Sequence, residues 1–497
     1  MQNGSLLAAI DLGSNSFRLE IGRLDHGHVQ RVEYLKETVR QGNGLDSERN
    51  LSPEAMQRGW DCLARFSERL GGFKRSQVRA VATQTLREAR NRDDFLRQAT
   101  KILGFPIDVV SGREEARLIY MGVAHLLPQS TERRLVIDIG GRSTELILGQ
   151  GYQSQQTESY RVGSVASSMK YFDNGHLDTT NFQRAEVAAQ AVLDEVAVSF
   201  DASQWDTAYG SSGTVGAVAD ILTAKGYEAG CVTRGGLDWL YSALLAAGHI
   251  DKVELIGLKD DRRAVIGGGV AILRALFDLL NLSELKVAAG ALRNGLLIDL
   301  LDREGADTDV RTASIQRLAL NFAVDSAHAN RVGKATLHFL EQLVSNEPEA
   351  HRDRLLRKAG WAAQVHEIGT RISHTDYHKH GAYILDNTDA PGFAQPELHR
   401  LSLLVFGHRG KLKKLSDTLE DVDFVHQLLA LRLAVIVCHA RRTPDTDNLL
   451  LRRTIEGFEL QLSSQWQSTY PQSIHLLHEE VLAWQKTGVT LWIKVVA

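Results

Sequence analysis

Two short apolar runs in this chain each end in an aspartate and a turn of small residues. Residues 6–16 read Leu-Leu-Ala-Ala-Ile-Asp-Leu-Gly-Ser-Asn-Ser, with Asp11 at the end of the apolar run. Residues 135–144 read Leu-Val-Ile-Asp-Ile-Gly-Gly-Arg-Ser-Thr, with Asp138 in the same place. An apolar run of this length that is bounded by turn residues is typical of a buried strand. Each aspartate is therefore predicted to lie where a strand ends and a turn begins.

The elements that follow the two turns repeat at matching distances. Ser52, with a proline after it, is a typical helix start. A second helix start, at Thr179, follows Asp138 at the same distance as Ser52 follows Asp11. Residues 78–85 and 207–214 then each join an apolar run to a small-residue turn. The pattern predicts a duplicated α/β fold with its site between the halves. Two unrelated α/β units are the alternative.

Both turns have the composition of a phosphate-binding loop. Glycine and small hydroxyl residues let backbone N–H groups approach a phosphate oxygen. An aspartate beside such a turn repels phosphate unless it holds Mg²⁺, directly or through water. Two facing turns therefore predict a cleft that grips a phosphate chain from both sides.

A candidate catalytic carboxylate follows the apolar residues 107–110. Ser111 and Glu114 have the spacing of a capping box, in which Glu114 bonds the backbone of the cap residue. Glu115 has no such role, and a helix N-terminus favours its ionised form. Glu115 is therefore a candidate base that accepts a proton from water. The alternative is that both glutamates only complement the helix dipole.

Composition limits the classes of function. The chain has 497 residues, 43% hydrophobic and 24% charged, which is ordinary for a globular protein of several domains. A net charge of −4 provides no general attraction for nucleic acid, so none is expected as a partner. The three cysteines lack metal-ligand spacing, and no apolar run is long enough to insert into a membrane. We expect a cytoplasmic protein, with peripheral attachment to a membrane left open.

The pattern changes in the C-terminal part. A polar stretch at residues 302–307 suggests a boundary. Beyond it, helical periodicity marks residues 315–322, 327–343, 355–367, 399–405 and 423–439, and shorter alternations at 454–460 and 490–495 predict strands. The predicted domains are 1–125, 126–302, 303–445 and 446–497.

Six motifs together resemble the exopolyphosphatase/guanosine pentaphosphate phosphatase family. They lie at residues 11–17, 83–87, 111–119, 138–146, 210–214 and 290–293, in the family's order. The resemblance implies duplicated actin-like ATPase (ribonuclease H-like) α/β domains, then an all-α HD-like domain and a small α+β C-terminal domain. It also implies a homodimer that releases terminal phosphate with Mg²⁺, and it leaves open whether a monovalent cation such as K⁺ is also needed.

The resemblance also implies roles for individual residues. Glu115 matches the general base, Asp138 and Glu145 match the acidic residues of the metal and water site, and Arg87 matches an arginine that contacts phosphate. The matched phosphate-loop positions are Ser14, Asn15, Ser16, Gly141, Ser143, Thr144, Ser212, Gly213 and Thr214.

Several positions depart from the family pattern or stand outside it. Arg142 replaces a small residue, and its side chain is predicted either to add a phosphate contact or to be solvated. Asn294 replaces a glutamate. The glycines 267–269 suggest a strand-to-helix turn, with an adenine-pocket turn as the alternative. His366 and Glu367 occupy the place of a His-Asp metal pair, and because of the glutamate we expect a metal-free site.

A short basic run lies in the helical region. Its cationic residues are Arg409, Lys411, Lys413 and Lys414, and they suggest a channel for a polyanion or else a solvated loop.

The leading interpretation is a Mg²⁺-dependent exopolyphosphatase that trims inorganic polyphosphate. The segment 378–393 looks closer to that branch of the family. The alternative substrate is guanosine pentaphosphate, which would lose its 5′ γ-phosphate. A kinase of the same superfamily, or an inactive polyphosphate-binding regulator, ranks lower.

Overall fold

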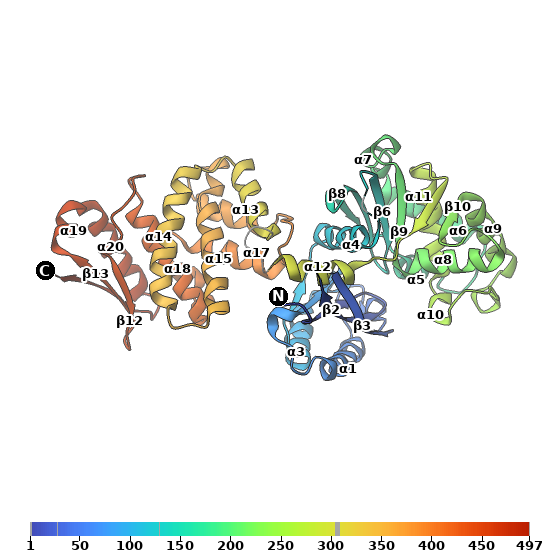
Figure 1. The fold of residues 1–497 in the computed structure, drawn as a ribbon, viewed down its shortest axis with the longest axis horizontal. Coiled ribbons are helices and arrows are strands. Elements are labelled where there is room, and N and C mark those ends of the chain that lie inside the picture. Colours follow the sequence, from blue (N-terminus) through green and yellow to red (C-terminus); the bar gives the residue numbers. More distant parts are fainter. Residues whose placement is uncertain (1, 27, 129, 304–308, 497) are drawn as a thin grey trace. The chain divides into compact units, whose positions relative to one another are not determined.

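The computed structural model describes residues 2–26, 28–128, 130–303 and 309–496. The chain forms two compact units, Met1–Asp309 and Val310–Ala497 (Figure 1). Most of the boundary predicted at residues 302–307 lies outside the described residues.

The first unit contains two sheets and the helices that cover them. The strands of the first sheet are β1 (Leu6–Leu12), β2 (Phe17–Asp25), β3 (His28–Glu37), β4 (Val78–Ala82) and β5 (Ile107–Val109). Those of the second are β6 (Arg133–Ile139), β7 (Thr144–Gln150), β8 (Gln153–Tyr160), β9 (Thr207–Ser211), β10 (Cys231–Thr233) and β11 (Glu284–Val287). The helices are α1 (Pro53–Arg69), α2 (Gln84–Glu88), α3 (Arg92–Leu103), α4 (Gly112–Leu126), α5 (Ser164–Tyr171), α6 (Thr179–Leu193), α7 (Val196–Ser199), α8 (Ser212–Lys225), α9 (Arg234–Ala247), α10 (Asp260–Arg263), α11 (Ile266–Leu279) and α12 (Leu292–Asp302).

The two sheets share one topology. The first has the order β3-β2-β1-β4-β5, and the second has the order β8-β7-β6-β9-β11 with β10 added at its edge. In both, the three strands from the hairpins are antiparallel and the next two pair in parallel. The predicted duplication is therefore confirmed, and each aspartate lies near the end of the first strand of its half.

The helices α1 and α6 begin at the predicted capping residues. The Ser52 side chain accepts a hydrogen bond from the Ala55 N–H at the start of α1, and Asp178 does the same for Asn181 at α6. The caps supply acceptors to N–H groups that the helix cannot pair itself.

Two helices fill the space between the sheets. α12 packs on β1 and β4, α4 packs on β7 and β8, and the two helices lie against each other (Figure 1). Their core includes buried residues of both sheets, such as Ala9 of β1 and Val136 of β6. This shared core holds the start of α4, and so Glu115, between the two aspartate turns.

The contact between α4 and α12 depends on glycine. A Cβ atom at Gly295 would lie 1.8 Å from the Leu118 carbonyl oxygen, and one at Gly122 would lie 2.2 Å from that of Ala291. Both obstacles are backbone atoms, which cannot turn aside as a side chain can.

We expect Gly295→Ala to lower the free energy of unfolding by about 3 kcal/mol, the upper end of the range for overpacking. The control is Gly333→Ala, because no heavy atom of the described residues outside its own helix's backbone lies within 4 Å of the added Cβ. Alanine at position 333 should stabilise the helix by roughly 0.5–1 kcal/mol. Urea denaturation measures both, and equal effects would show that the helix crossing tolerates a Cβ atom.

The glycines 267–269 do not form a strand-to-helix turn. They lie in the first turn of α11, and a Cβ at Gly268 would lie 2.6 Å from the Ser164 carbonyl oxygen and the Ser168 nitrogen of α5. The predicted turn was wrong because glycine is favoured both in tight turns and where two helices pack closely, so the glycines alone do not distinguish the two cases.

The second unit is mainly helical. Its helices are α13 (Val310–Asn321), α14 (Ser326–Val344), α15 (Glu349–Val365), α16 (Tyr377–Asp386), α17 (Gln395–Gly407), α18 (Val422–Val437), α19 (Ser464–Thr469) and α20 (Pro471–Gln485). Its sheet contains β12 (Leu450–Arg453), β13 (Phe458–Ser463) and β14 (Leu491–Val496). The strand predicted at 454–460 starts later, because residues 454–457 form a turn in which Gly457 has a φ of 148°. Within the described ranges, none of the helices combines the length and apolar character that a membrane crossing requires.

Candidate active site

The two aspartate turns line one cavity. Its wall includes Asp11, Asp138 and Glu115, together with the turn residues Gly13, Ser14, Asn15, Ser16, Gly140, Gly141 and Ser143. Ser212 and Gly213, at the start of α8, complete the wall. The sequence therefore correctly predicted a cleft between facing turns.

Several buried donors at this cleft have no acceptor. Among the described residues, the Asn15 Nδ2, Ser16 Oγ and Arg18 Nε atoms, from residues that line the cavity, have no hydrogen-bond partner. Buried polar groups are rarely left unpaired, so a group of such atoms beside one cavity indicates a ligand site. All three atoms can donate a hydrogen bond, which fits an anionic ligand with many oxygens.

Two predicted phosphate-loop residues direct their hydroxyl groups elsewhere. The Thr144 hydroxyl donates to the Val162 carbonyl at 2.6 Å, and the Thr214 hydroxyl donates to that of Ile139 at 2.9 Å. Neither residue lines the cavity. Both side chains fasten neighbouring segments to the turns.

Ser212 has unusual backbone geometry for its residue type. Its φ is 93°, in the region that favours glycine, although it begins a helix. Its hydroxyl accepts hydrogen bonds from Thr214 N–H at 3.2 Å and Val215 N–H at 3.4 Å. Strained backbone of this kind persists where the surrounding structure holds it, often at functional sites.

Glu115 is held by Arg87. The Arg87 Nη1 atom donates to Glu115 Oε2 at 2.6 Å and also to the Val110 carbonyl, while its Nε and Nη2 atoms donate to the Gln84 side chain. Arg87 does not line the cavity. Burial raises the pKa of Glu115, and the Arg87 guanidinium counters this by stabilising the carboxylate. Arg87 therefore positions Glu115, and the predicted contact of Arg87 with phosphate stays a prediction.

Asp138 and Glu145 face each other across β6 and β7. They are register partners in the antiparallel pair, and both are buried. Burial raises the pKa of Asp138 to about 6, with Asp11 adding to the effect. Burial, then Glu115 and Asp138, raise the pKa of Glu145 well above its ordinary value. Glu145 does not line the cavity, and its Oε1 atom accepts a hydrogen bond from Ser159.

Mg²⁺ fits this group of carboxylates. Asp11, Asp138 and Glu115 line one cavity, and their mutual repulsion contributes to the raised pKa values of Asp138 and Glu115. Mg²⁺ prefers oxygen ligands and usually binds through one or two carboxylates and phosphate oxygens. Asp11 and Asp138 are the residues best placed to hold it.

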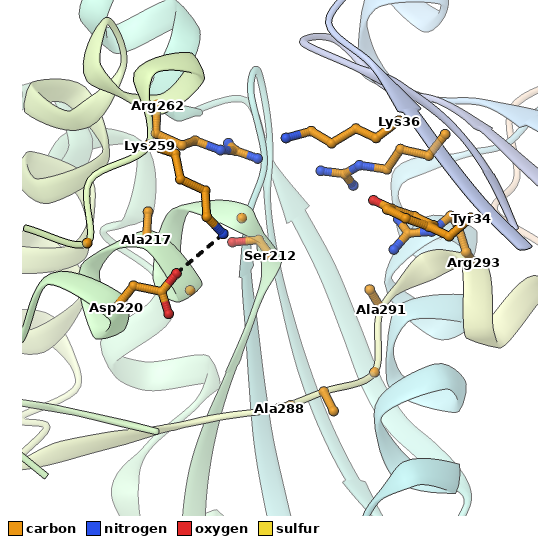
Figure 2. A pocket seen from close by; sticks show the side chains of 16 residues that line it. Tyr34, Lys36, Ser212, Ala217, Asp220, Lys259, Arg262, Ala288, Ala291 and Arg293 are labelled. Carbon is orange, nitrogen blue, oxygen red and sulfur yellow. Dashed lines mark ion pairs between the residues drawn. The ribbon is translucent and has the colours of Figure 1, made fainter. Parts of the chain in front are cut away.

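A second, larger cavity adjoins the first. It has a volume of ≈ 380 Å³ and shares Arg18, Ser212, Gly213, Arg262 and Ala291 with the carboxylate cavity. Figure 2 shows cationic side chains that converge from opposite walls, with Lys259 and Arg262 on one side and Lys36 and Arg293 on the other. Burial, then Arg18, lower the pKa of Arg262. Lys36 and Lys259 pair with Asp261 and Asp220, whereas Arg18 and Arg262 repel each other, which indicates a site for an anion.

Apolar and aromatic groups line the rest of the larger cavity. The Tyr34 ring lies beside the Arg293 guanidinium, 5.1 Å from its carbon to the ring centroid. Small residues at Gly216, Ala217, Ala288 and Ala289 leave room for a flat ligand.

Sequence reasoning found Ser212, Gly213 and the motif at 290–293 but missed the other residues of this larger cavity. Arg18 lies just beyond the first turn and could have been found from that position. Tyr34 and Lys36 lie on β3, and Lys259 and Arg262 lie at and in the short helix α10. Neither element carries a motif, and only the fold brings them together.

Arg142 is not the solvated side chain considered for it, and its contact with phosphate stays a prediction. Its Nη2 atom donates to Glu88 Oε2 at 3.0 Å, and its Nη1 atom donates to the Gly42 carbonyl at 3.2 Å. Arg142 thereby links the turn of the second half to the first half. Asn294 caps α12, because its Oδ1 atom accepts a hydrogen bond from Ala291 N–H.

Glu114 does not complete the predicted capping box. Ser111 does accept a hydrogen bond from the Glu114 N–H, but the Glu114 carboxylate makes two bonds of 2.8 Å to Arg117. Arg117 also pairs with buried Asp299 of α12. The Glu114 carboxylate thus neutralises a buried arginine rather than bonding the half-buried N–H group of Ser111.

The basic run lies in the second unit, and its members differ. Lys411 and Lys413 are exposed, and Arg409 lies over the Tyr377 ring at 4.7 Å. The Lys414 ammonium donates to the Phe406 carbonyl at 2.7 Å, and burial lowers its pKa to about 8. A polyanion channel at these residues stays a prediction.

Known proteins resemble the chain over nearly its whole length. Residues 21–304 match the description "Ppx/GppA phosphatase family", and residues 310–483 match "Ppx/GppA phosphatase, domain III". Two Vibrio cholerae proteins, from strains O395 and N16961, are each 37% identical over 473 residues, covering 94% of this chain and 93% of the relative. Both are named guanosine-5′-triphosphate,3′-diphosphate pyrophosphatase.

Solved structures share the fold of more than half of the chain. An exopolyphosphatase from Cytophaga hutchinsonii has a TM-score of 0.53 at 22% identity, over 60% of this chain and 98% of its own. An Aquifex aeolicus PPX-GPPA enzyme has a TM-score of 0.50 at 24% identity, over 59% and 98%. The predicted fold class, duplicated actin-like α/β domains followed by a helical region, is confirmed.

Proposed function

This chain belongs to the Ppx/GppA phosphatase family of phosphoanhydride hydrolases, and we propose that its substrate is guanosine 5′-triphosphate 3′-diphosphate. The products are orthophosphate and guanosine 5′-diphosphate 3′-diphosphate. The sequence alone favoured inorganic polyphosphate. The names of the two Vibrio cholerae relatives support the nucleotide instead.

The observation that carries this proposal is the composition of the larger cavity. Phosphate chains require only cations, which Arg18, Lys36 and Arg262 supply. The Tyr34 ring and the floor of small residues fit a purine base, because a base stacks on an aromatic ring. A cavity of ≈ 380 Å³ also lies within the usual size range of small-molecule sites.

The chemistry follows from the carboxylate cavity. Glu115 accepts a proton from water while the water oxygen bonds to the terminal phosphorus and the bridging P–O bond breaks. Arg87 favours the ionised form of Glu115 and orients its carboxylate. Asn15, Ser16 and the start of α8 orient the phosphate, and Arg18 and Arg262 neutralise charge on its oxygens. Mg²⁺ held by Asp11 and Asp138 would neutralise further charge on the phosphate oxygens. Water needs room beside Glu115, which the cavity provides.

Inorganic polyphosphate is the second candidate substrate. Five cations line the larger cavity and would bind a phosphate chain without a nucleoside. A homodimer and a cytoplasmic location remain expectations, and whether K⁺ is also needed stays open.

Tyr34→Ala separates the two substrates. We expect KM for guanosine pentaphosphate to rise by roughly 5- to 160-fold, since stacking on a base contributes roughly 1–3 kcal/mol. The rate with tripolyphosphate should stay within about twofold. Phosphate release from both substrates and from ATP is measured in parallel.

The matched control is Tyr152→Ala. Tyr152 is also partly exposed, but it stacks on His125 and lines neither cavity. If wild-type protein cleaves tripolyphosphate faster than guanosine pentaphosphate and Tyr34→Ala slows neither, the substrate is an inorganic phosphate chain.

A further inference from the structure

Two histidines and a glutamate meet at one buried point in the second unit. His328 lies in the first turn of α14, and His366 and Glu367 directly follow α15. One nitrogen from each ring and one carboxylate oxygen all lie within 4.8 Å of one another. The two histidines are 4% and 1% exposed.

The hydrogen bonds of His366 define its free atom. Its Nδ1 lies 2.7 Å from the Ala363 carbonyl, which can only accept, so Nδ1 carries the hydrogen. The Nε2 atom therefore presents a lone pair. Among the described residues, His366 Nε2 and His328 Nδ1 have no hydrogen-bond partner although they are buried. The other nitrogen of His328, Nε2, lies 3.9 Å from Glu367 Oε1. Buried ring nitrogens left unpaired in two adjacent histidines indicate a missing partner.

The charges around the cluster are nearly balanced. Glu367 Oε1 accepts a hydrogen bond from Arg441 at 2.8 Å, and Arg441 also pairs with Asp325. Arg331 is another nearby cation, and its positive charge disfavours the binding of a metal ion. An outer partner such as Arg441 is common on a ligating carboxylate.

We propose that His328, His366 and Glu367 bind one divalent transition-metal ion, with Zn²⁺ the best match, and that water completes the coordination. Two imidazoles and one carboxylate are a usual ligand set for Zn²⁺. Tetrahedral coordination requires ligand atoms about 3.4 Å apart, given zinc bonds of roughly 2.0–2.1 Å. The observed limit of 4.8 Å leaves a small contraction of side chains.

This site differs from the metal-free pair expected from the sequence. That expectation was based on Glu367 in place of an aspartate, but glutamate also binds zinc. The third ligand, His328, comes from another helix and had no signal in the sequence. The metal would join the start of α14 to the end of α15 and stabilise the second unit.

The test uses full-length protein stripped of metal with a chelator and titrated with Co²⁺ as a spectroscopic substitute for Zn²⁺. Tetrahedral Co²⁺ with nitrogen ligands absorbs strongly in the visible range, and an octahedral oxygen site such as the carboxylate cleft does not. We expect one strongly absorbing Co²⁺ per chain, displaced by Zn²⁺, together with a rise in Tm.

Three variants remove one ligand each: His328→Gln, His366→Gln and Glu367→Gln. Each should lose the absorption and bind Zn²⁺ at least about 100-fold more weakly. The control is His426→Gln, because His426 is also buried with an unpaired Nε2 but lies against the Phe458 ring, outside the cluster. It should keep the absorption.

Glu367→Gln is the decisive variant if a histidine variant unfolds, since glutamine keeps the size and the acceptor for Arg441. The proposal is overturned if the wild-type protein shows no tetrahedral Co²⁺ absorption. It is also overturned if the absorption persists in Glu367→Gln and in any histidine variant that remains folded.

Discussion

Glu115→Gln should reduce kcat by roughly 10²–10⁴, the range for loss of a general base. Glutamine keeps the shape and still accepts a hydrogen bond from Arg87, so the start of α4 should not move. KM should change by less than about threefold, because Glu115 carries no share of phosphate binding. In the wild-type protein, the pKa of Glu115 is raised by burial. The base form is therefore lost as pH falls, and the wild-type rate should decline at a higher pH than for an exposed glutamate.

Glu158→Gln is the control for this substitution. Glu158 of β8 forms an ion pair of 2.8 Å with Arg113 of α4, the helix that carries Glu115, but Glu158 lies outside the cavity. Its removal should leave kcat within about twofold. Initial rates of phosphate release across pH 5–9 provide the measurement. Activity of Glu115→Gln within a few-fold of the wild type would exclude Glu115 as the base.

Local patterns predicted the turns and helix starts well. Asp11, Asp138 and Ser52 lie where their neighbours in the sequence indicated, because strand ends and caps depend on residues close in the chain. The duplication was visible for the same reason. Each half repeats its signals in the same order, and the two sheets repeat one topology.

Long-range contacts account for what the sequence did not predict. Glu114 is engaged by Arg117 and, through it, by Asp299, which lies far along the chain. Arg142 reaches Glu88 only because the two halves fold against each other. The cationic cavity likewise joins Lys36 to residues near position 260. No periodicity or spacing in a single sequence encodes such pairs, since they depend on how the halves pack.

Asp138→Asn should make the metal-free protein more stable at pH 7–8, even though it impairs function. Burial raises the pKa of Asp138 from 3.8 to about 6. The folded state therefore holds this proton more tightly than the unfolded state, and stability falls as pH rises from about 4 to 6. Asparagine carries no charge and avoids that loss, which is about 3 kcal/mol at most for a shift of this size. The gain should vanish below pH 4, where aspartate is protonated in both states.

Mg²⁺ should reverse the order of stability. If Asp138 helps to hold the ion, Mg²⁺ raises the Tm of the wild-type protein and raises that of Asp138→Asn much less. The Mg²⁺ concentration for half-maximal rate should increase at least about tenfold in the variant. Scanning calorimetry with and without Mg²⁺, at pH 4 and pH 7.5, measures the first effect, and initial rates across Mg²⁺ concentrations measure the second.

Asp206→Asn is the control, since Asp206 is an exposed partner of Arg133 and lines neither cavity. The same Mg²⁺ dependence in Asp138→Asn as in the wild type would remove Asp138 from the metal site. The repulsion among the buried carboxylates would then require another cation, and Arg18 is the nearest candidate.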